Sequence, residues 1–176
     1  AAVVGHSMGG MTVLSHARQF PQCYGKNKTG RRLVGVALIS SAAEGLPRSP
    51  LGEILQNPAL EAVRFAARYA PKLVHRTRGA ARAVLRPILK TASFGDDEVS
   101  PSVVAFSEAM IHETEVATLV EFLHALEVHD ETAALPVLAK VPTLIACGER
   151  DMLPPVKHSE EMAAALPDCA LVVLPG

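Results

Sequence analysis

Four short apolar runs along the chain predict strands. Residues 1–4 are apolar and end at a glycine, which indicates the end of a buried strand. Residues 33–40 and 142–148 are uninterrupted apolar runs, and residues 170–176 form a third. Runs without alternating polar positions are typical of strands that are buried on both faces of a parallel sheet.

Helical patterns connect these runs. Residues 9–20 predict a helix that ends before Pro21, and residues 157–166 predict another. Residues 25–32 are polar and basic and contain two glycines, which favours an exposed loop. Strand, helix and strand follow one another near both ends of the chain, so we predict an α/β fold with a mostly parallel sheet.

The middle of the chain has a different pattern. Residues 47–131 contain no strand-like run and are rich in alanine, leucine, arginine and glutamate at helical spacing. The apolar positions that would line helix faces are Leu60, Val63, Ala67, Ala70, Val103, Phe106, Met110, Val116, Leu119, Val120 and Leu123. We therefore predict a helical insertion over residues 47–131, within a core made of residues 1–46 and 132–176.

Charge within the insertion is divided by sign. Eight Lys and Arg residues and one acid lie between Glu61 and Lys90, whereas ten acids and no Lys or Arg lie between Asp96 and Glu131. Two helical hairpins with complementary solvated faces account for this division. The alternatives are an anion or phosphate site on the basic half, or a regulatory or interaction role for the insertion.

Composition narrows the class of protein. The chain has 176 residues, 49% of them hydrophobic, which is enough for one domain with a sizeable core. Its net charge of −1 gives no support for nucleic-acid binding or for attraction to an anionic membrane. No apolar run approaches the roughly 20 residues of a membrane span.

The three cysteines bear on the compartment of the protein. Cys23, Cys147 and Cys169 are widely spaced and odd in number, which favours reduced thiols over disulfides or a zinc site. We therefore predict a cytoplasmic protein. A signal segment before Ala1 would not be visible in this chain.

The first ten residues contain a pattern that carries chemistry. Residues 5–9 read GHSMG, a Gly-x-Ser-x-Gly sequence between a predicted strand and a predicted helix. A serine at such a turn stands above the sheet edge as a nucleophile, and the turn strains its backbone. We expect that a side chain at Gly5 or Gly9 would collide with the strand or the helix, and we name Ser7 as the candidate nucleophile.

Two neighbours of Ser7 complete this turn, which we call the elbow (residues 5–10). Gly10 is expected to let the helix lie tightly on the sheet. The Met8 amide is expected to face the reacting carbonyl as an oxyanion donor, because the first amides of a helix lack helical partners. The alternative is a glycine-rich helix start with no catalytic role.

Together, the stretches GHSMGG, LVGVALISSA and VPTLIACGERDMLPP resemble the α/β-hydrolase superfamily, in particular its esterase, lipase and epoxide-hydrolase-like members with a helical cap. The resemblance implies a partial α/β-hydrolase fold in which residues 47–131 form the cap. It also implies a triad in the order serine, acid, histidine, with Asp151 as the acid. The competing interpretation of Asp151 is a carboxylate that caps a loop or a helix.

The resemblance also implies a histidine after the last strand, and the chain ends at Gly176. The histidines that are present do not fit this role; they are His6, His16, His75, His112, His124, His129 and His158. We therefore expect a fragment that lacks the triad histidine and the strands before the elbow, and that is inactive by itself. Its strand before Ser7 would be an unpaired apolar edge.

These residues predict a serine hydrolase of the carboxylesterase or lipase type, which acts on a small, apolar ester or related acyl compound through an acyl-enzyme. We expect no cofactor, and no metal, because His112 and Glu113 lack the second histidine of a zinc motif. The alternative is a non-catalytic protein of the same fold that binds a hydrophobic small molecule.

Overall fold

A computed structural model describes residues 1–25, 32–44, 58–69, 100–151 and 153–175. The chain forms two compact units, which we describe separately. The first unit comprises Ala1–Ser49 and His129–Gly176, and the second comprises Pro50–Val128.

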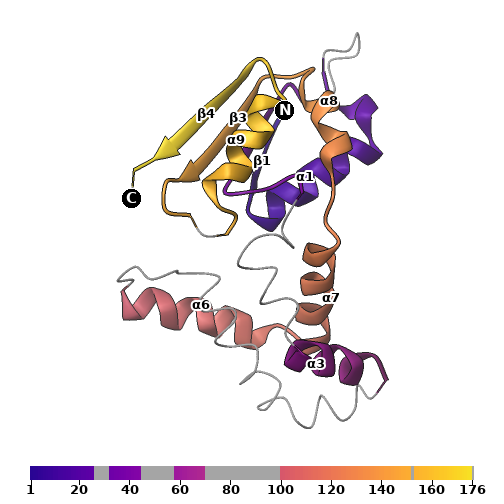
Figure 1. Ribbon diagram of the computed structural model, residues 1–176, viewed down its shortest axis with the longest axis vertical. Coiled ribbons are helices and arrows are strands. Elements are labelled where there is room, and N and C mark those ends of the chain that lie inside the picture. The colour runs from indigo at the N-terminus through magenta and orange to yellow at the C-terminus, as the bar shows by residue number, and fades with distance from the viewer. Residues whose placement is uncertain (26–31, 45–57, 70–99, 152, 176) are drawn as a thin grey trace. The chain divides into compact units, whose positions relative to one another are not determined.

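The first unit contains a four-stranded parallel sheet (Figure 1). Its strands are β1 (Ala2–His6), β2 (Gly35–Ile39), β3 (Thr143–Gly148) and β4 (Cys169–Leu174), in the spatial order β1-β2-β3-β4. The predicted α/β fold with a parallel sheet is therefore confirmed. All four strands point the same way, so their carboxyl ends meet at one edge of the sheet.

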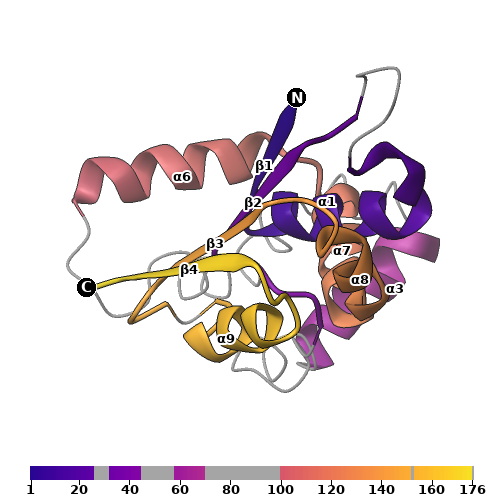
Figure 2. The ribbon, with the colours of Figure 1, turned by 90° about the horizontal axis from the view of Figure 1, so that it is seen from above.

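Helices of the first unit pack on one face of this sheet (Figure 2). They are α1 (Met8–Gln19), α8 (Leu135–Leu138) and α9 (Val156–Ala164), with 3-10 turns η1 (Pro21–Cys23) and η3 (Thr132–Ala134). A single buried cluster joins them to the strands, and it includes Leu14 of α1, Leu38 of β2, Leu138 of α8, Ile145 of β3 and Met162 of α9.

The opposite face of the sheet is apolar but exposed. Side chains alternate along a strand, so the residues between the core positions point away from the three helices. Val4 on β1, Leu144 on β3, and Val172 and Leu174 on β4 are exposed by 65%, 37%, 42% and 57% of their surface. In the described part of the chain, one face of the sheet is thus packed over β2 and β3 and the other is bare and apolar, while β4 is exposed on both faces, with Leu171 and Val173 exposed by 38% and 40%.

The described residues of the second unit are helical. They form α3 (Pro58–Tyr69), α6 (Pro101–Glu113) and α7 (Val116–Glu127), and α3 contacts α7. The predicted loop over residues 25–32 lies mostly outside the described residues, at positions 26–31. Most of the basic stretch and the start of the acidic one, residues 70–99, lie outside them as well, so the predicted anion site stays a prediction.

The structure also bears on membrane-spanning helices and on disulfides. No helix among the described residues is long and apolar enough to span a bilayer. Cys23, Cys147 and Cys169 form no disulfide, and Cys147 is buried.

Candidate active site

Ser7 stands at the tight turn between β1 and α1. Its backbone angles are φ 50° and ψ −121°, a left-handed conformation that a side chain disfavours. The strand before it comes very close to the helix after it, because a Cβ atom at Gly5 would lie 2.6 Å from the backbone of Gly9 and Gly10. Only glycine at position 5 allows this close approach.

The other two glycines of the elbow differ from each other. A Cβ atom at Gly10 would lie 2.4 Å from the Ser41 hydroxyl, so Gly10 lets α1 lie against the loop after β2. The same atom would lie 3.3 Å from the Gly5 carbonyl of β1. Apart from its chain neighbours and the nearby backbone of its own helix, a Cβ atom at Gly9 would meet no described atom within 4 Å. The expected collision at Gly9 is therefore wrong, because Gly9 is an exposed second residue of α1.

Hydrogen bonds from the end of β2 hold Ser7 on both sides. Ser7 donates its amide to the Ile39 carbonyl at 2.8 Å. The Ser7 carbonyl accepts the amides of Gly10 at 2.9 Å and Met11 at 3.3 Å, and the Ser41 hydroxyl at 3.0 Å. A strained backbone conformation persists when several surrounding hydrogen bonds hold it in place, as they do here.

Met8 is the first residue of α1, directly after Ser7. The first amides of a helix have no partner within the helix and lie at the positive end of its dipole. The Met8 amide therefore has the polarity that a developing oxyanion requires.

Asp151 follows β3 by three residues and is partly buried. Its amide donates to the Gly148 carbonyl at 3.2 Å, and its Oδ1 accepts the Leu153 amide at 2.9 Å. The carboxylate therefore accepts a backbone hydrogen bond from two residues further along the chain, as the competing interpretation of a loop cap expects. Its second oxygen accepts no hydrogen bond from the described residues.

The register of the sheet relates Ser7 to Asp151. His6 pairs with Ile39 and Ile39 pairs with Ala146, so β1, β2 and β3 end at similar levels. Ser7 and Asp151 therefore follow the same sheet edge, with β2 between them. The backbones of β1 and β3 lie two strand spacings apart, which is about 10 Å, and side chains that extend toward each other shorten this distance.

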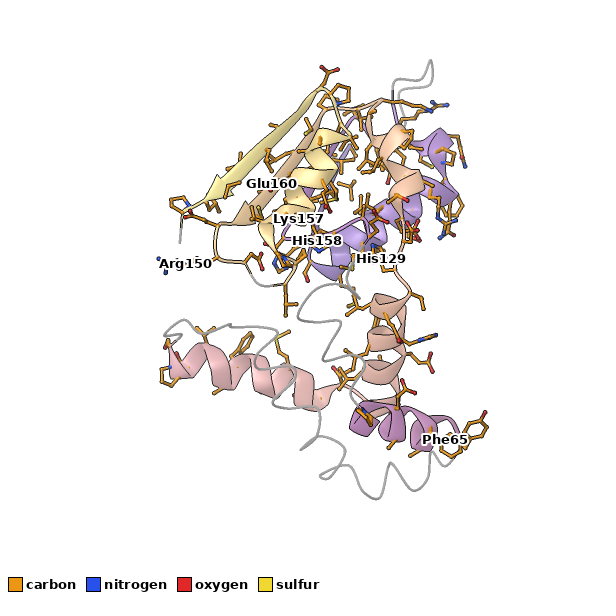
Figure 3. The ribbon with its side chains drawn as sticks, in the orientation of Figure 1. Phe65, His129, Arg150, Lys157, His158 and Glu160 are labelled. Atoms are coloured by element: carbon orange, nitrogen blue, oxygen red, sulfur yellow. The ribbon has the colours of Figure 1, made fainter. Side chains whose placement is uncertain are left out.

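Three described histidines, His16, His129 and His158, lie against groups other than Ser7 and Asp151. His129 Nε2 lies 2.9 Å from the Ala42 carbonyl, and His158 Nδ1 lies 3.8 Å from Glu161 within α9 (Figure 3). His16 Nδ1 lies 3.0 Å from the Tyr24 hydroxyl. Among the described side chains, no histidine is hydrogen-bonded to Ser7 or Asp151; His75 and the side chain of His112 lie outside them. The described part of the chain also contains no cluster of potential metal ligands.

Sequence reasoning missed the residues that support the elbow. Ser41 is 1% exposed and reaches the Ser7 carbonyl, and Ser40 before it has a positive φ of 45°. The available signal was two serines directly after an apolar strand. Neither the contact across 34 residues nor the backbone angle can be read from a single sequence.

Sequence reasoning also missed an ion pair that holds the segment at residues 129–131. Arg18 of α1 donates to both carboxylate oxygens of Glu131, with Nη2 3.2 Å from Oε1. The Arg18 hydrogen bond lowers the pKa of the Glu131 carboxyl, against burial, which raises it. The Glu131 amide also donates to the Ala43 carbonyl at 2.7 Å. The segment at residues 129–131 is thus anchored to the loop after β2.

A model of the alpha/beta hydrolase family matches residues 1–176, which confirms the resemblance seen in the sequence. The enol-lactonase from Burkholderia xenovorans LB400 is 25% identical, with a TM-score of 0.64 over 99% of this chain and 56% of that one. A thermophilic esterase from Thermogutta terrifontis is 24% identical, with a TM-score of 0.63 over 99% of this chain and 56% of that one.

A bromoperoxidase from Bacillus anthracis is 18% identical, with a TM-score of 0.63 over 99% of this chain and 58% of that one. The shared fold thus occurs in proteins with different activities. No curated protein matches the chain. The chain spans a little more than half the length of these solved structures.

Proposed function

The chain belongs to the alpha/beta hydrolase family, and from that premise we propose that Ser7 is the nucleophile of a serine hydrolase. The observation that carries the proposal is the strained Ser7 backbone at the junction of β1 and α1. A left-handed serine backbone costs free energy of folding, and such strain is typical of sites where a functional group has to be presented. At a strand-to-helix turn, the group presented is the serine hydroxyl.

In the proposed reaction, the Ser7 hydroxyl attacks the carbonyl carbon of an ester or related acyl compound. An imidazole accepts the Ser7 proton, and the Met8 amide donates to the oxyanion that forms. The imidazole then gives the proton to the leaving alcohol, which leaves an acyl group on Ser7. Water, deprotonated by the same imidazole, attacks this acyl-enzyme. The imidazolium returns that proton to the Ser7 oxygen as the bond to the acyl group breaks, and the acid is released.

Asp151 is proposed to orient that imidazole and to stabilise its charged form. Its carboxylate has one oxygen with no partner among the described residues, and it follows the same sheet edge as Ser7. We assign the imidazole to a histidine in a longer polypeptide, since the solved relatives are nearly twice as long as this chain. The 176-residue chain alone is then expected to be inactive. The proposed substrate is a small, apolar ester, and the proposed chemistry needs no cofactor.

The test is labelling of the complete gene product by a fluorophosphonate, which reacts with activated serines. We expect labelling at Ser7, loss of labelling in Ser7→Ala, and a fall in ester hydrolysis of about 10⁴-fold in Asp151→Asn. Ser159→Ala is the matched control, because this serine is buried in α9 and its hydroxyl makes no hydrogen bond in the described chain.

Full hydrolysis by Ser7→Ala would overturn the proposal. A protein that is never labelled, yet binds hydrophobic esters without cleaving them, would be the non-catalytic binder of the alternative interpretation. Turnover by the 176-residue chain alone would place the base among its own histidines.

A further inference from the structure

The carbonyl of Ser7 accepts one hydrogen bond from outside the elbow and α1. Two of its donors, the amides of Gly10 and Met11, belong to α1 and move with that helix. The third donor, the Ser41 hydroxyl at 3.0 Å, comes from the loop after β2. Ser41 therefore ties the start of α1 to a different strand of the sheet.

That carbonyl belongs to the same peptide group as the Met8 amide. A peptide group is planar, and its C=O and N–H point in opposite directions. A donor that fixes the direction of the Ser7 carbonyl therefore also fixes the direction of the Met8 N–H. We infer that Ser41 is a positioning residue that aims the Met8 N–H at the oxyanion, an inference that rests on the proposed function.

Ser41 is itself held in one place. Its side chain is 1% exposed and lies against Gly10, where a Cβ atom would come within 2.4 Å of its hydroxyl. The residue before it, Ser40, donates its amide to the Ala146 carbonyl of β3 at 2.8 Å. The hydroxyl thus extends from a loop whose first residue is bonded to β3.

The hydrogen bond also acts on the charge of the amide. A donor on a carbonyl polarises the whole peptide group, so the N–H of that group becomes a stronger donor. The oxyanion exists only during the reaction, so this effect stabilises the transition state and leaves the bound ester unaffected. Loss of the Ser41 hydroxyl should therefore lower kcat and leave KM unchanged.

The experiment compares Ser41→Ala, Ser41→Thr and the control Ser159→Ala in the complete gene product. For Ser41→Ala we expect kcat to fall about tenfold, less than the roughly 10²–10³-fold that follows loss of an oxyanion donor itself. KM should stay unchanged, and the dissociation constant of a phenylboronic acid, whose tetrahedral adduct mimics the oxyanion, should rise about tenfold. Ser41→Thr keeps the hydroxyl and should restore both values.

A merely structural role would give another result. If kcat falls only as far as the melting temperature does, or if Ser41→Thr and Ser41→Ala lose the same activity, the inference is overturned. It is also overturned if Ser41→Ala binds the boronic acid as well as Ser159→Ala does. Absence of labelling at Ser7 in the unsubstituted protein would instead defeat the proposed function, so the two failures are distinguishable.

Discussion

At the residue scale, Gly5 and Gly9 lie two positions from Ser7 on either side, yet their surroundings differ. A Cβ atom at Gly5 would overlap backbone atoms, which cannot move without opening the elbow, whereas one at Gly9 meets no described atom beyond its chain neighbours and the nearby backbone of α1. We expect Gly5→Ala to lower the free energy of unfolding by about 1–3 kcal/mol or more. Gly9→Ala should raise it by about 0.5–1 kcal/mol, because alanine is favoured over glycine in a helix. Urea unfolding of both variants measures the difference.

Equal destabilisation by the two substitutions would contradict this structure of the elbow. The motif alone predicts that both glycines are required, and it is right about the position of Ser7 and wrong about Gly9. The reason is that a pattern fixes spacing along the chain but contains no information about what lies beside each Cβ atom. The same limit hid Ser41, whose contact with Ser7 joins residues 34 positions apart.

At the scale of elements, the ion pair of Arg18 and Glu131 joins α1 to the segment before η3. The Arg18 hydrogen bond lowers the pKa of Glu131 in the folded chain, so the pair stabilises the fold above the carboxyl's ordinary pKa. This stabilisation is lost as the pH falls through the lowered folded value. We expect Glu131→Gln to lower the melting temperature by a few degrees at neutral pH, and by less in acid. Thermal unfolding over a pH series measures how the melting temperatures of the two proteins approach each other as the pH falls.

Arg18→Lys is the matched control, because it keeps the charge and removes the planar fork that binds both carboxylate oxygens. It should lose part of the stabilisation and keep part of the pH dependence. A melting difference between Glu131→Gln and the unsubstituted protein that stays constant down to acid pH would show that the pair does not act through the Glu131 charge.

Helices and strands were predictable where a buried element is long enough to leave a clear apolar pattern in the sequence. The strands at residues 33–40 and 142–148 were predicted from apolar runs and appear as β2 and β3, three residues and one residue shorter. The helix predicted at 157–166 appears as α9. By contrast, η3 and α8 were not predicted, because segments of three and four residues are too short to show a helical period.

At the scale of the whole molecule, the alternation of strands and helices predicted an α/β fold, which the sheet and the family match confirm. The order of the strands could not be predicted, since the sequence does not say which strands are neighbours. That order determines the site, because it places exactly one strand, β2, between the strands that precede Ser7 and Asp151. The loop after β2 then bonds in two directions: Ser40 donates to β3, and Ser41 donates to the Ser7 carbonyl.

The bare face of the sheet has a consequence for the 176-residue chain in solution. Val4 on the outer strand β1 and Val172 on the outer strand β4 are exposed, and outer strands also offer unpaired backbone groups. We expect the chain to self-associate as its concentration rises. Val4→Lys combined with Val172→Lys should make it monomeric, because two ammonium groups on this face oppose its burial against a second copy.

Light scattering after size-exclusion chromatography measures the mass, and circular dichroism checks that the helices are retained. Gln22→Lys combined with Ala164→Lys adds the same charge at exposed positions of η1 and α9, away from the strands. This control should stay associated if the apolar face is the cause. A control that becomes monomeric to the same extent would assign the effect to net charge, since a higher charge of one sign also keeps chains apart.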